Sequence, residues 1–194
     1  MDAKEFKSTW LANKAIYRTR KVIADGGELV IIAPGVVRFG EQKEVDLMIR
    51  KFGYRGTPYT LNAYKSDPEL RELGHAAAHL IHGSSEGRFR ITYVPGKLTR
   101  DEITSVGFDY MDLKAAIKTY KPHTLKDGLN IVKGEEIYFI TSPSLGLWTA
   151  KEKFISSLKT NLRFAERMIA KEPNETLWQQ LKELDTEDIA KYEA

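Results

Sequence analysis

The sequence predicts an α/β protein, with a mixed or mostly parallel sheet flanked by helices in a three-layer-like arrangement and a helical extension at its C-terminal end. Short apolar runs rich in β-branched residues alternate with segments of helical periodicity over the first 145 or so residues. Beyond Trp148 the sequence becomes charged and keeps only the helical periodicity. We therefore expect an α/β domain over residues 1–148 and a helical extension over 149–194.

The first helix is expected from about residue 9 to residue 24, where apolar residues recur at helical spacing among basic ones. Gly26 and Gly27 follow it, as glycines commonly do at helix C-termini. Residues 28–33 read Glu-Leu-Val-Ile-Ile-Ala and are bounded by Pro34. This continuous apolar run predicts a strand that is buried on both faces.

The middle of the chain predicts two more helices and a second strand. Apolar spacing indicates a helix over about 42–52. Asp67 and Pro68 mark a helix start, because proline is tolerated in the first turn and a carboxylate is favourable at the positive end of the helix dipole, and this helix is expected to reach His82. Residues 88–94 alternate polar and apolar side chains, as a half-buried strand does.

Two short helices and a third strand complete the predicted domain. Thr99 and Glu102 have the spacing of a capping box, which predicts a helix start. A further helix is expected over 112–120, and residues 135–141 form the last strand that the pattern predicts. Three strands that alternate with helices favour a largely parallel or mixed sheet.

The C-terminal extension carries one apolar stripe over two heptads, and a second helix is expected at about 175–184. We expect the first of these helices to pack on the α/β core, and the alternative is that it mediates homo-oligomerisation. The stripe consists of Ile155, Leu158, Leu162, Ala165 and Ile169.

Composition narrows the classes of function. The 194 residues include 30 Lys and Arg against 27 Asp and Glu, a net charge of +3, and the charges are interspersed, so no basic patch indicates nucleic-acid binding. The absence of cysteine excludes disulfides and thiol nucleophiles. No signal segment and no apolar run of about 18 residues is present, so we expect a cytoplasmic protein without a membrane partner.

The opening segment carries a resemblance to a known family. It reads Trp10-Leu-Ala-Asn-Lys14-Ala-Ile-Tyr17 and leads to Gly26-Gly27 and the apolar strand. Two later segments continue the resemblance, and they read Ile-Thr-Tyr-Val94 and Met111-Asp-Leu-Lys-Ala-Ala-Ile. In order and spacing, residues 9–148 resemble the C-terminal domain of the nickel-dependent lactate racemases. On the residues alone, Lys14 would be a solvated surface lysine.

The resemblance implies a substrate-binding and catalytic role for Lys14, which matches the family's lysine twelve residues before the glycine pair. Its ammonium group would hold the carboxylate, or an oxygen near the reacting carbon, of a 2-hydroxy acid. The family has a glutamine where this chain has Leu11. We therefore expect a larger or more apolar 2-hydroxy acid than lactate, with Trp10, Leu11 and Tyr17 as pocket walls.

The resemblance also implies that the chain is part of a larger enzyme. The family's nickel-ligating histidine, the lysine that anchors its pincer nucleotide and its acid–base histidines belong to an N-terminal half that this sequence does not include. We expect no cofactor on this chain alone and a nickel-pincer nucleotide in the intact enzyme. The expected function is that of the substrate-clamping domain of a racemase or epimerase, an isomerase whose partners are a 2-hydroxy acid and the N-terminal domain.

Three histidines share one face of the helix expected before Gly83. His75, His79 and His82 are spaced i, i+4 and i+7, and two histidines four residues apart can chelate a metal ion. A small histidine-ligated metalloenzyme is therefore one alternative function. The other interpretation is that these side chains lie at an interface or cap the helix C-terminus, where imidazolium is favourable.

Basic loops offer weaker candidates for anion binding. The loop Gly83-Ser84-Ser85-Glu-Gly87 leads to Arg88 and could form a nest of backbone N–H groups, or simply turn a helix into a strand. Arg38 and Arg55 lie in glycine-containing loops and are further candidates for substrate binding. These loops also leave open a non-catalytic module that binds an anion or a protein. Phosphate-binding, dinucleotide-binding and serine-hydrolase motifs are absent from the sequence.

Overall fold

The computed structural model describes residues 3–153 of the chain. The helical segments expected over 155–169 and 175–184 lie outside the described residues. The chain divides into two compact units, Met1–Leu147 and Trp148–Ala194. The sheet, the helices and the candidate site described below all belong to the first unit.

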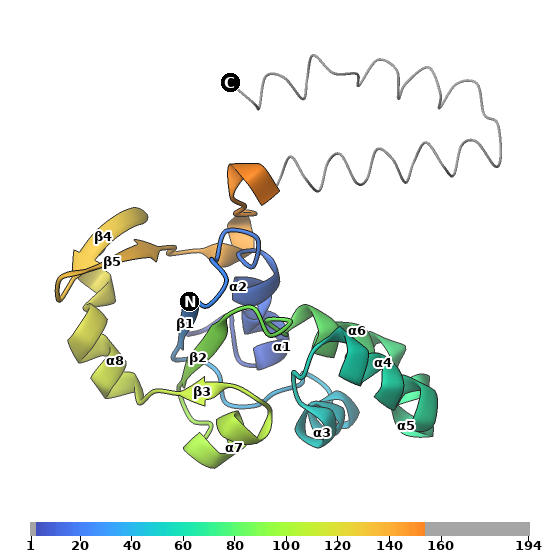
Figure 1. The fold of residues 1–194 in the computed structure, drawn as a ribbon. Coiled ribbons are helices and arrows are strands. Elements are labelled where there is room, and N and C mark those ends of the chain that lie inside the picture. The colour runs from blue at the N-terminus through green and yellow to red at the C-terminus, as the bar shows by residue number, and fades with distance from the viewer. Residues whose placement is uncertain (1–2, 154–194) are drawn as a thin grey trace. The chain divides into compact units, whose positions relative to one another are not determined.

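A parallel three-stranded sheet lies at the centre of the first unit (Figure 1). Its order is β1 (Glu28–Ala33), β2 (Arg90–Pro95) and β3 (Asp109–Tyr110). β1 and β2 pair along their whole length, whereas β3 contributes two residues opposite the middle of β2. The expected α/β class with a parallel sheet flanked by helices is confirmed.

Helices surround the sheet and also pack on one another. α8 contacts β2 and α7 contacts β3, while α6 packs against α3, α4 and α5 (Figure 1). The helices are α1 (Thr9–Ala12), α2 (Lys14–Tyr17), α3 (Lys43–Phe52), α4 (Thr57–Ser66), α5 (Pro68–Glu72), α6 (Gly74–His82), α7 (Arg100–Ser105) and α8 (Leu113–Tyr120), with short 3-10 turns η1 (Pro122–Thr124) and η2 (Pro143–Leu145).

Two of the expected helices are interrupted in the structure. The prediction of a single helix over 9–24 is wrong, because Asn13 (φ −66°, ψ −2°) separates α1 from α2 and α2 ends at Tyr17, so that residues 18–24 are not helical. The helix expected over 67–82 breaks at Leu73 (φ −101°, ψ 52°), directly before Gly74. Glycine is unfavourable in a helix interior, so the presence of Gly74 in the sequence was a signal for this break.

The strand expected over 135–141 does not join the parallel sheet. It is β5 (Glu135–Phe139), which pairs with β4 (Gly128–Val132) in a separate antiparallel hairpin. Lys133 and Gly134 connect the two strands, both with positive φ (53° and 87°), as a two-residue type I′ turn requires. The sheet's third strand is instead the short β3, and neither β3, β4 nor α4 was expected from the sequence.

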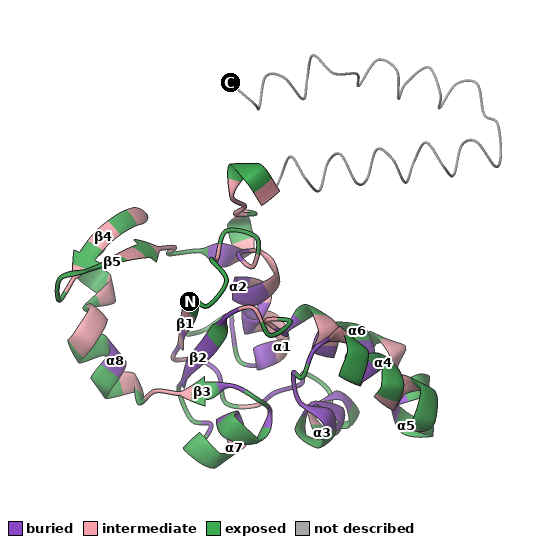
Figure 2. Ribbon diagram, in the orientation of Figure 1, coloured by how far each residue is buried: buried purple, intermediate pink, exposed green. Residues whose placement is uncertain are grey.

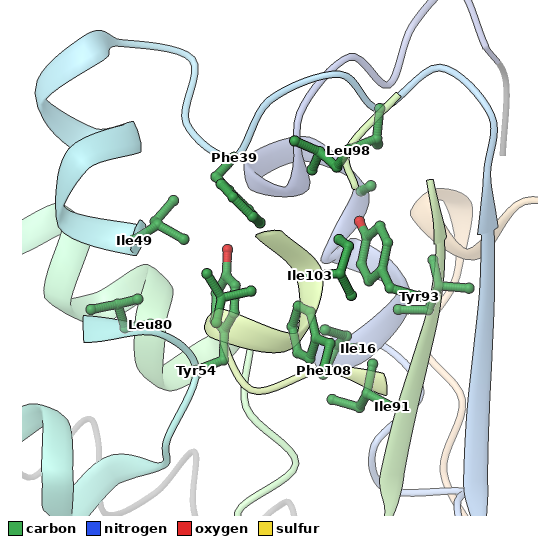
Figure 3. Close-up of a cluster of buried hydrophobic side chains, with 14 of the residues drawn as sticks. Ile16, Phe39, Ile49, Tyr54, Leu80, Ile91, Tyr93, Leu98, Ile103 and Phe108 are labelled. Carbon is green, nitrogen blue, oxygen red and sulfur yellow. The ribbon is translucent and has the colours of Figure 1, made fainter. Parts of the chain in front are cut away.

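A row of stacked rings connects the sheet to the helices. Tyr93 of β2 stacks on Phe108, with centroids 5.4 Å apart, and Phe108 stacks on Tyr54, with centroids 4.6 Å apart (Figure 3). All three rings are buried, and Ile16 and Ile103 lie around them. Each stacked pair contributes roughly 0.5–1.5 kcal/mol beyond area burial. The core therefore joins α1–α2, β2 and α6 into one packed body.

Exposure differs sharply between the sheet and the hairpin (Figure 2). β2 is buried along five of its six residues, whereas Leu129 and Ile131 of β4 are 73% and 74% exposed, and Tyr138 of β5 is 56% exposed. Within residues 3–153, no helix is long and apolar enough to cross a membrane.

Candidate functional site

The helical segment that bears Lys14 begins beside the loop at the carboxyl end of β1. The loop that follows this strand is held against it by backbone hydrogen bonds, from Thr9 N–H to the Arg38 carbonyl (3.1 Å) and from Trp10 N–H to the Phe39 carbonyl (2.9 Å). Gly35 makes the close approach feasible, because a Cβ there would lie 2.4 Å from the Ala3 carbonyl oxygen. Open α/β sheets bind ligands at the carboxyl ends of their strands.

Lys14 is half-buried, and its Nζ lies 5.9 Å from the centroid of the Phe6 ring. Arg18 follows one turn later on the same side of the helical segment, and its guanidinium donates to the Gly146 carbonyl (3.1 Å) while its Nε is buried without a hydrogen-bond partner. Within the described residues, neither Lys14 nor Arg18 forms an ion pair with a carboxylate. Two unneutralised cations one turn apart favour an anion between them.

Aromatic side chains flank Lys14 on both sides along the helical segment. Trp10 lies against α6, and the centroid of its ring is 4.3 Å from that of His79 and 5.9 Å from that of His75. The ring centroids of Tyr17 and His82 are 5.9 Å apart. Leu11 is half-buried and packs against the core. We refer to the surface formed by Trp10, Leu11, Lys14, Tyr17 and Arg18 as the Lys14 face.

The three histidines of α6 have different environments. His75 and His82 are exposed, whereas His79 is buried and forms a hydrogen bond from its Nε2 to the Tyr54 hydroxyl (2.9 Å). Burial lowers the pKa of His79 to about 3, with a smaller contribution from the nearby His82. In the described part of the chain, no group of three or more histidine, aspartate or glutamate side chains could hold a metal ion.

Sequence reasoning missed a buried polar cluster behind the Lys14 face. Tyr54, Thr9 and Asn13 are buried polar residues here, and the Tyr54 hydroxyl contacts both His79 and the Thr9 hydroxyl (2.9 Å each). Burial raises the pKa of Tyr54, so the phenol stays protonated. Tyr54 follows Gly53, whose φ is 65°. In this turn the sequence indicated only the neighbouring Arg55, a charged residue, as a candidate for substrate binding. A tyrosine in a glycine-bounded turn gives no sequence signal of burial.

Arg38 and Arg55 are engaged away from the Lys14 face. The guanidinium group of Arg38 forms an ion pair with Glu41 (2.7 Å) and donates to the Gly40 carbonyl (3.1 Å). Ser8 donates a hydrogen bond to Glu41, which lowers the pKa of that carboxyl group. Arg55 is exposed and lies over the Tyr59 ring at 5.3 Å.

The loop over 83–87 contains a carboxylate of its own, that of Glu86, which binds donors that an external anion could otherwise use. The Glu86 carboxylate accepts hydrogen bonds from the Thr57 backbone N–H (3.1 Å), from the Thr57 hydroxyl (2.9 Å) and from Ser84 (2.5 Å), so it occupies the N-terminal end of α4. Burial by itself raises the pKa of Glu86, but these hydrogen bonds outweigh it and the pKa lies below its usual value. Ser84 is buried and Ser85 is half-buried.

Arg88 ties this loop to the end of the first helical segment. Its guanidinium donates to the carbonyls of Arg20 and Ile23 (2.9 Å each) and to the Asp25 carboxylate (2.7 Å). Because these groups consume its donors, Arg88 has a structural role that accounts for its position. The anion-binding candidates of this loop and Lys14 therefore lie in two chemically different places.

The fold and the Lys14 face together describe an α/β domain with a cationic, aromatic-flanked surface on the helical segment that precedes the first strand of a parallel sheet. No protein-family model and no curated protein matches the chain. A crystal structure of a protein from Thermotoga maritima, a structural-genomics target, is similar, with 27% identity and a TM-score of 0.50. The alignment covers 57% of this chain and 29% of the Thermotoga chain, so this chain corresponds to less than a third of that protein.

Proposed function

We propose that this chain is the substrate-clamping domain of a racemase or epimerase that acts on a 2-hydroxy acid, and that Lys14 binds the substrate's carboxylate or a nearby oxygen. The observation that supports this proposal is the pair of cations on the Lys14 face. Lys14 and Arg18 have no carboxylate partner among the described residues, whereas Arg50 and Lys51 each contact two carboxylates. A bound carboxylate would supply the missing negative charge.

The walls of the face fit an apolar substrate substituent. Trp10, Leu11 and Tyr17 are all half-buried, so each presents apolar surface beside Lys14 without being sealed in the core. Leucine at position 11 offers no hydrogen bond to a substrate hydroxyl. We therefore expect 2-hydroxyisocaproate to bind more tightly than lactate, and Leu11→Gln to reduce that preference.

The catalytic steps would need a second half of the enzyme. In the family that this chain resembles, the nickel-pincer nucleotide supplies hydride transfer at the hydroxylated carbon, and the residues that hold it belong to the N-terminal half. The role of this chain is then to bind and orient the acid. Lys14 would offset charge at the substrate oxygens, and the half-buried rings would limit the access of water.

A titration of the chain with 2-hydroxyisocaproate and with lactate, followed by NMR, tests the proposal. We expect Lys14→Met to weaken binding at least tenfold, because a charge-assisted hydrogen bond contributes about 1.5–3 kcal/mol. Lys114→Met, which removes an exposed lysine on α8, is the matched control and should leave binding unchanged. Equal affinity in all three proteins, or no binding at all, would reject the proposal and favour a non-catalytic module.

A further inference from the structure

A chain of hydrogen bonds behind the Lys14 face has only one allowed direction. The Phe39 carbonyl can only accept, so the Thr9 hydroxyl donates to it (3.0 Å). The Thr9 oxygen then accepts from the Tyr54 hydroxyl (2.9 Å), which leaves the Tyr54 oxygen to accept from His79 Nε2 (2.9 Å). The network therefore assigns the imidazole proton of His79 to Nε2 and leaves Nδ1 with a lone pair.

Both ends of this chain of hydrogen bonds contact Trp10. At one end, the Phe39 carbonyl also accepts from the Trp10 backbone N–H (2.9 Å), so the main chain of Trp10 is fixed by the oxygen that begins the network. At the other end, the His79 ring lies against the Trp10 indole, with centroids 4.3 Å apart and planes 30° apart. Backbone and side chain of one residue are thus held by one network.

Close packing leaves the network little freedom to rearrange. Thr9 is fully buried, and Tyr54 and His79 are 6% and 8% exposed. The Tyr54 ring stacks on Phe108, and a Cβ at Gly83 would lie 2.5 Å from its Cε1 atom, so the ring is also packed against the backbone after α6. Figure 3 shows the Tyr54 hydroxyl directed toward Phe39. A broken bond here would leave a buried polar group unpaired, at a cost of about 1–3 kcal/mol.

We propose that His79 is a positioning residue of the Lys14 face, held in its Nε2–H form by Tyr54 and Thr9 so that its ring fixes the Trp10 indole as a wall of the binding surface. Trp10 lies one helical turn before Lys14, so the two side chains are neighbours along one side of the helical segment. The role in binding rests on the proposed function. The direction of the hydrogen bonds and the anchoring of Trp10 do not.

Nitrogen NMR of the imidazole ring in the whole chain tests the direction of the network without any mutation. We expect the ¹⁵N shifts and couplings of His79 to place its proton on Nε2. A proton on Nδ1 would overturn the assignment. The resonances can be identified by their loss in His79→Gln, and exposed His75 serves as an internal reference for an imidazole in solvent.

Fluorine NMR of 5-fluorotryptophan reports the anchoring of Trp10, whose signal is the one lost in Trp10→Phe. Tyr54→Phe removes the hydroxyl between Thr9 and His79, and we expect the Trp10 signal to broaden or split, with Thr9→Val as a milder variant should Tyr54→Phe not fold. His79→Phe keeps a ring against Trp10 and should broaden the signal less than His79→Gln. An unchanged Trp10 signal in His79→Gln and in a folded Tyr54 or Thr9 variant would overturn the positioning role.

Ligand affinity separates the two proposals. If 2-hydroxyisocaproate binds, we expect Thr9→Val to weaken it severalfold although Thr9 lies behind the Lys14 face. Unchanged affinity in a variant with a loosened Trp10 would overturn the role of His79 in binding. Failure of the unmodified chain to bind either hydroxy acid would reject the proposed function, and the two NMR readouts would still decide whether His79 holds Trp10.

Discussion

The Lys14 face and the loop over 83–88 contain similar groups but use them differently. Both bring basic side chains close to a helix. In the loop, Glu86 binds the start of α4, and Arg88 is saturated by two carbonyls and Asp25. On the Lys14 face, two cations lack a carboxylate among residues 3–153. The difference shows that the partners available inside the fold, and not the residue type, distinguish a structural cation from one that can bind a ligand.

Arg88→Met should give the largest loss of stability, and it tests whether Arg88 is a structural cation. It removes three charge-assisted hydrogen bonds, two to the carbonyls of Arg20 and Ile23 and one to the Asp25 carboxylate. We expect a loss of about 1.5–3 kcal/mol in the free energy of unfolding, measured by chemical denaturation. A loss below about 0.5 kcal/mol would show that Arg88 is not a structural cation.

Acid should destabilise the protein through His79, which lies behind the Lys14 face. Its pKa is about 3 when folded and 6.5 when unfolded, so in this window the unfolded state binds a proton that the folded state does not. Stability is therefore fully present well above pH 6.5 and falls as the pH drops toward the folded pKa. From pH 6.5 to 5 we expect a loss of about 1.6 kcal/mol. Denaturation at several pH values checks this, and His79→Gln should flatten the dependence.

Glu86→Gln should have a smaller effect. The substitution keeps hydrogen-bond acceptors for Thr57 but removes the negative charge at the start of α4, which is worth about 0.3–1 kcal/mol. Because the pKa of Glu86 lies below its usual value, the charge is present at neutral pH. Thermal unfolding of both proteins measures the difference, and Glu72→Gln, which changes an exposed carboxylate in the last turn of α5, is the control. A gain in stability would contradict the assigned role.

Lys14→Met should change stability least, by no more than about 0.5 kcal/mol, because Lys14 has no ion pair among the described residues. The same substitution is expected to abolish or strongly weaken binding of 2-hydroxyisocaproate. If Lys14→Met and Arg88→Met lowered the free energy of unfolding by the same amount, the distinction between the two regions would be wrong. In that case Lys14 would be structural as well.

Local signals in the sequence predicted several elements correctly. The apolar run over 28–33 is the strand β1, and the capping box from Thr99 to Glu102 begins α7. The expected burial of β1 on both faces is wrong, because β1 is an edge strand in which only Ile31 and Ala33 are buried. The strand pattern over 135–141 was correct as a strand and wrong as a member of the sheet, because the alternation of side chains does not specify the pairing partner. The turn at Lys133-Gly134 was the signal that a hairpin would form.

Trp10, Lys14 and Tyr17 share one side of the helical segment, although the helix that was expected there is broken at Asn13. Asn13 has right-handed backbone angles (φ −66°, ψ −2°), so the spacing of Trp10, Lys14 and Tyr17 survives the interruption. The break depends on burial, since the Asn13 side chain is enclosed beside Tyr54 and Gly83. A propensity-based argument contains no information on such an enclosure.

Hydrophobic periodicity and local capping were enough to predict the α/β class and the strand over 28–33 from the sequence. The role of Lys14 and its aromatic neighbours came from the family resemblance and stays a prediction. Only the tertiary structure decided which polar groups have partners. Burial lowers the pKa of His79, and the hydrogen-bond partner of its ring is Tyr54, 25 residues earlier, at 2.9 Å. Contacts between residues this far apart in sequence arise from packing, which local patterns do not encode.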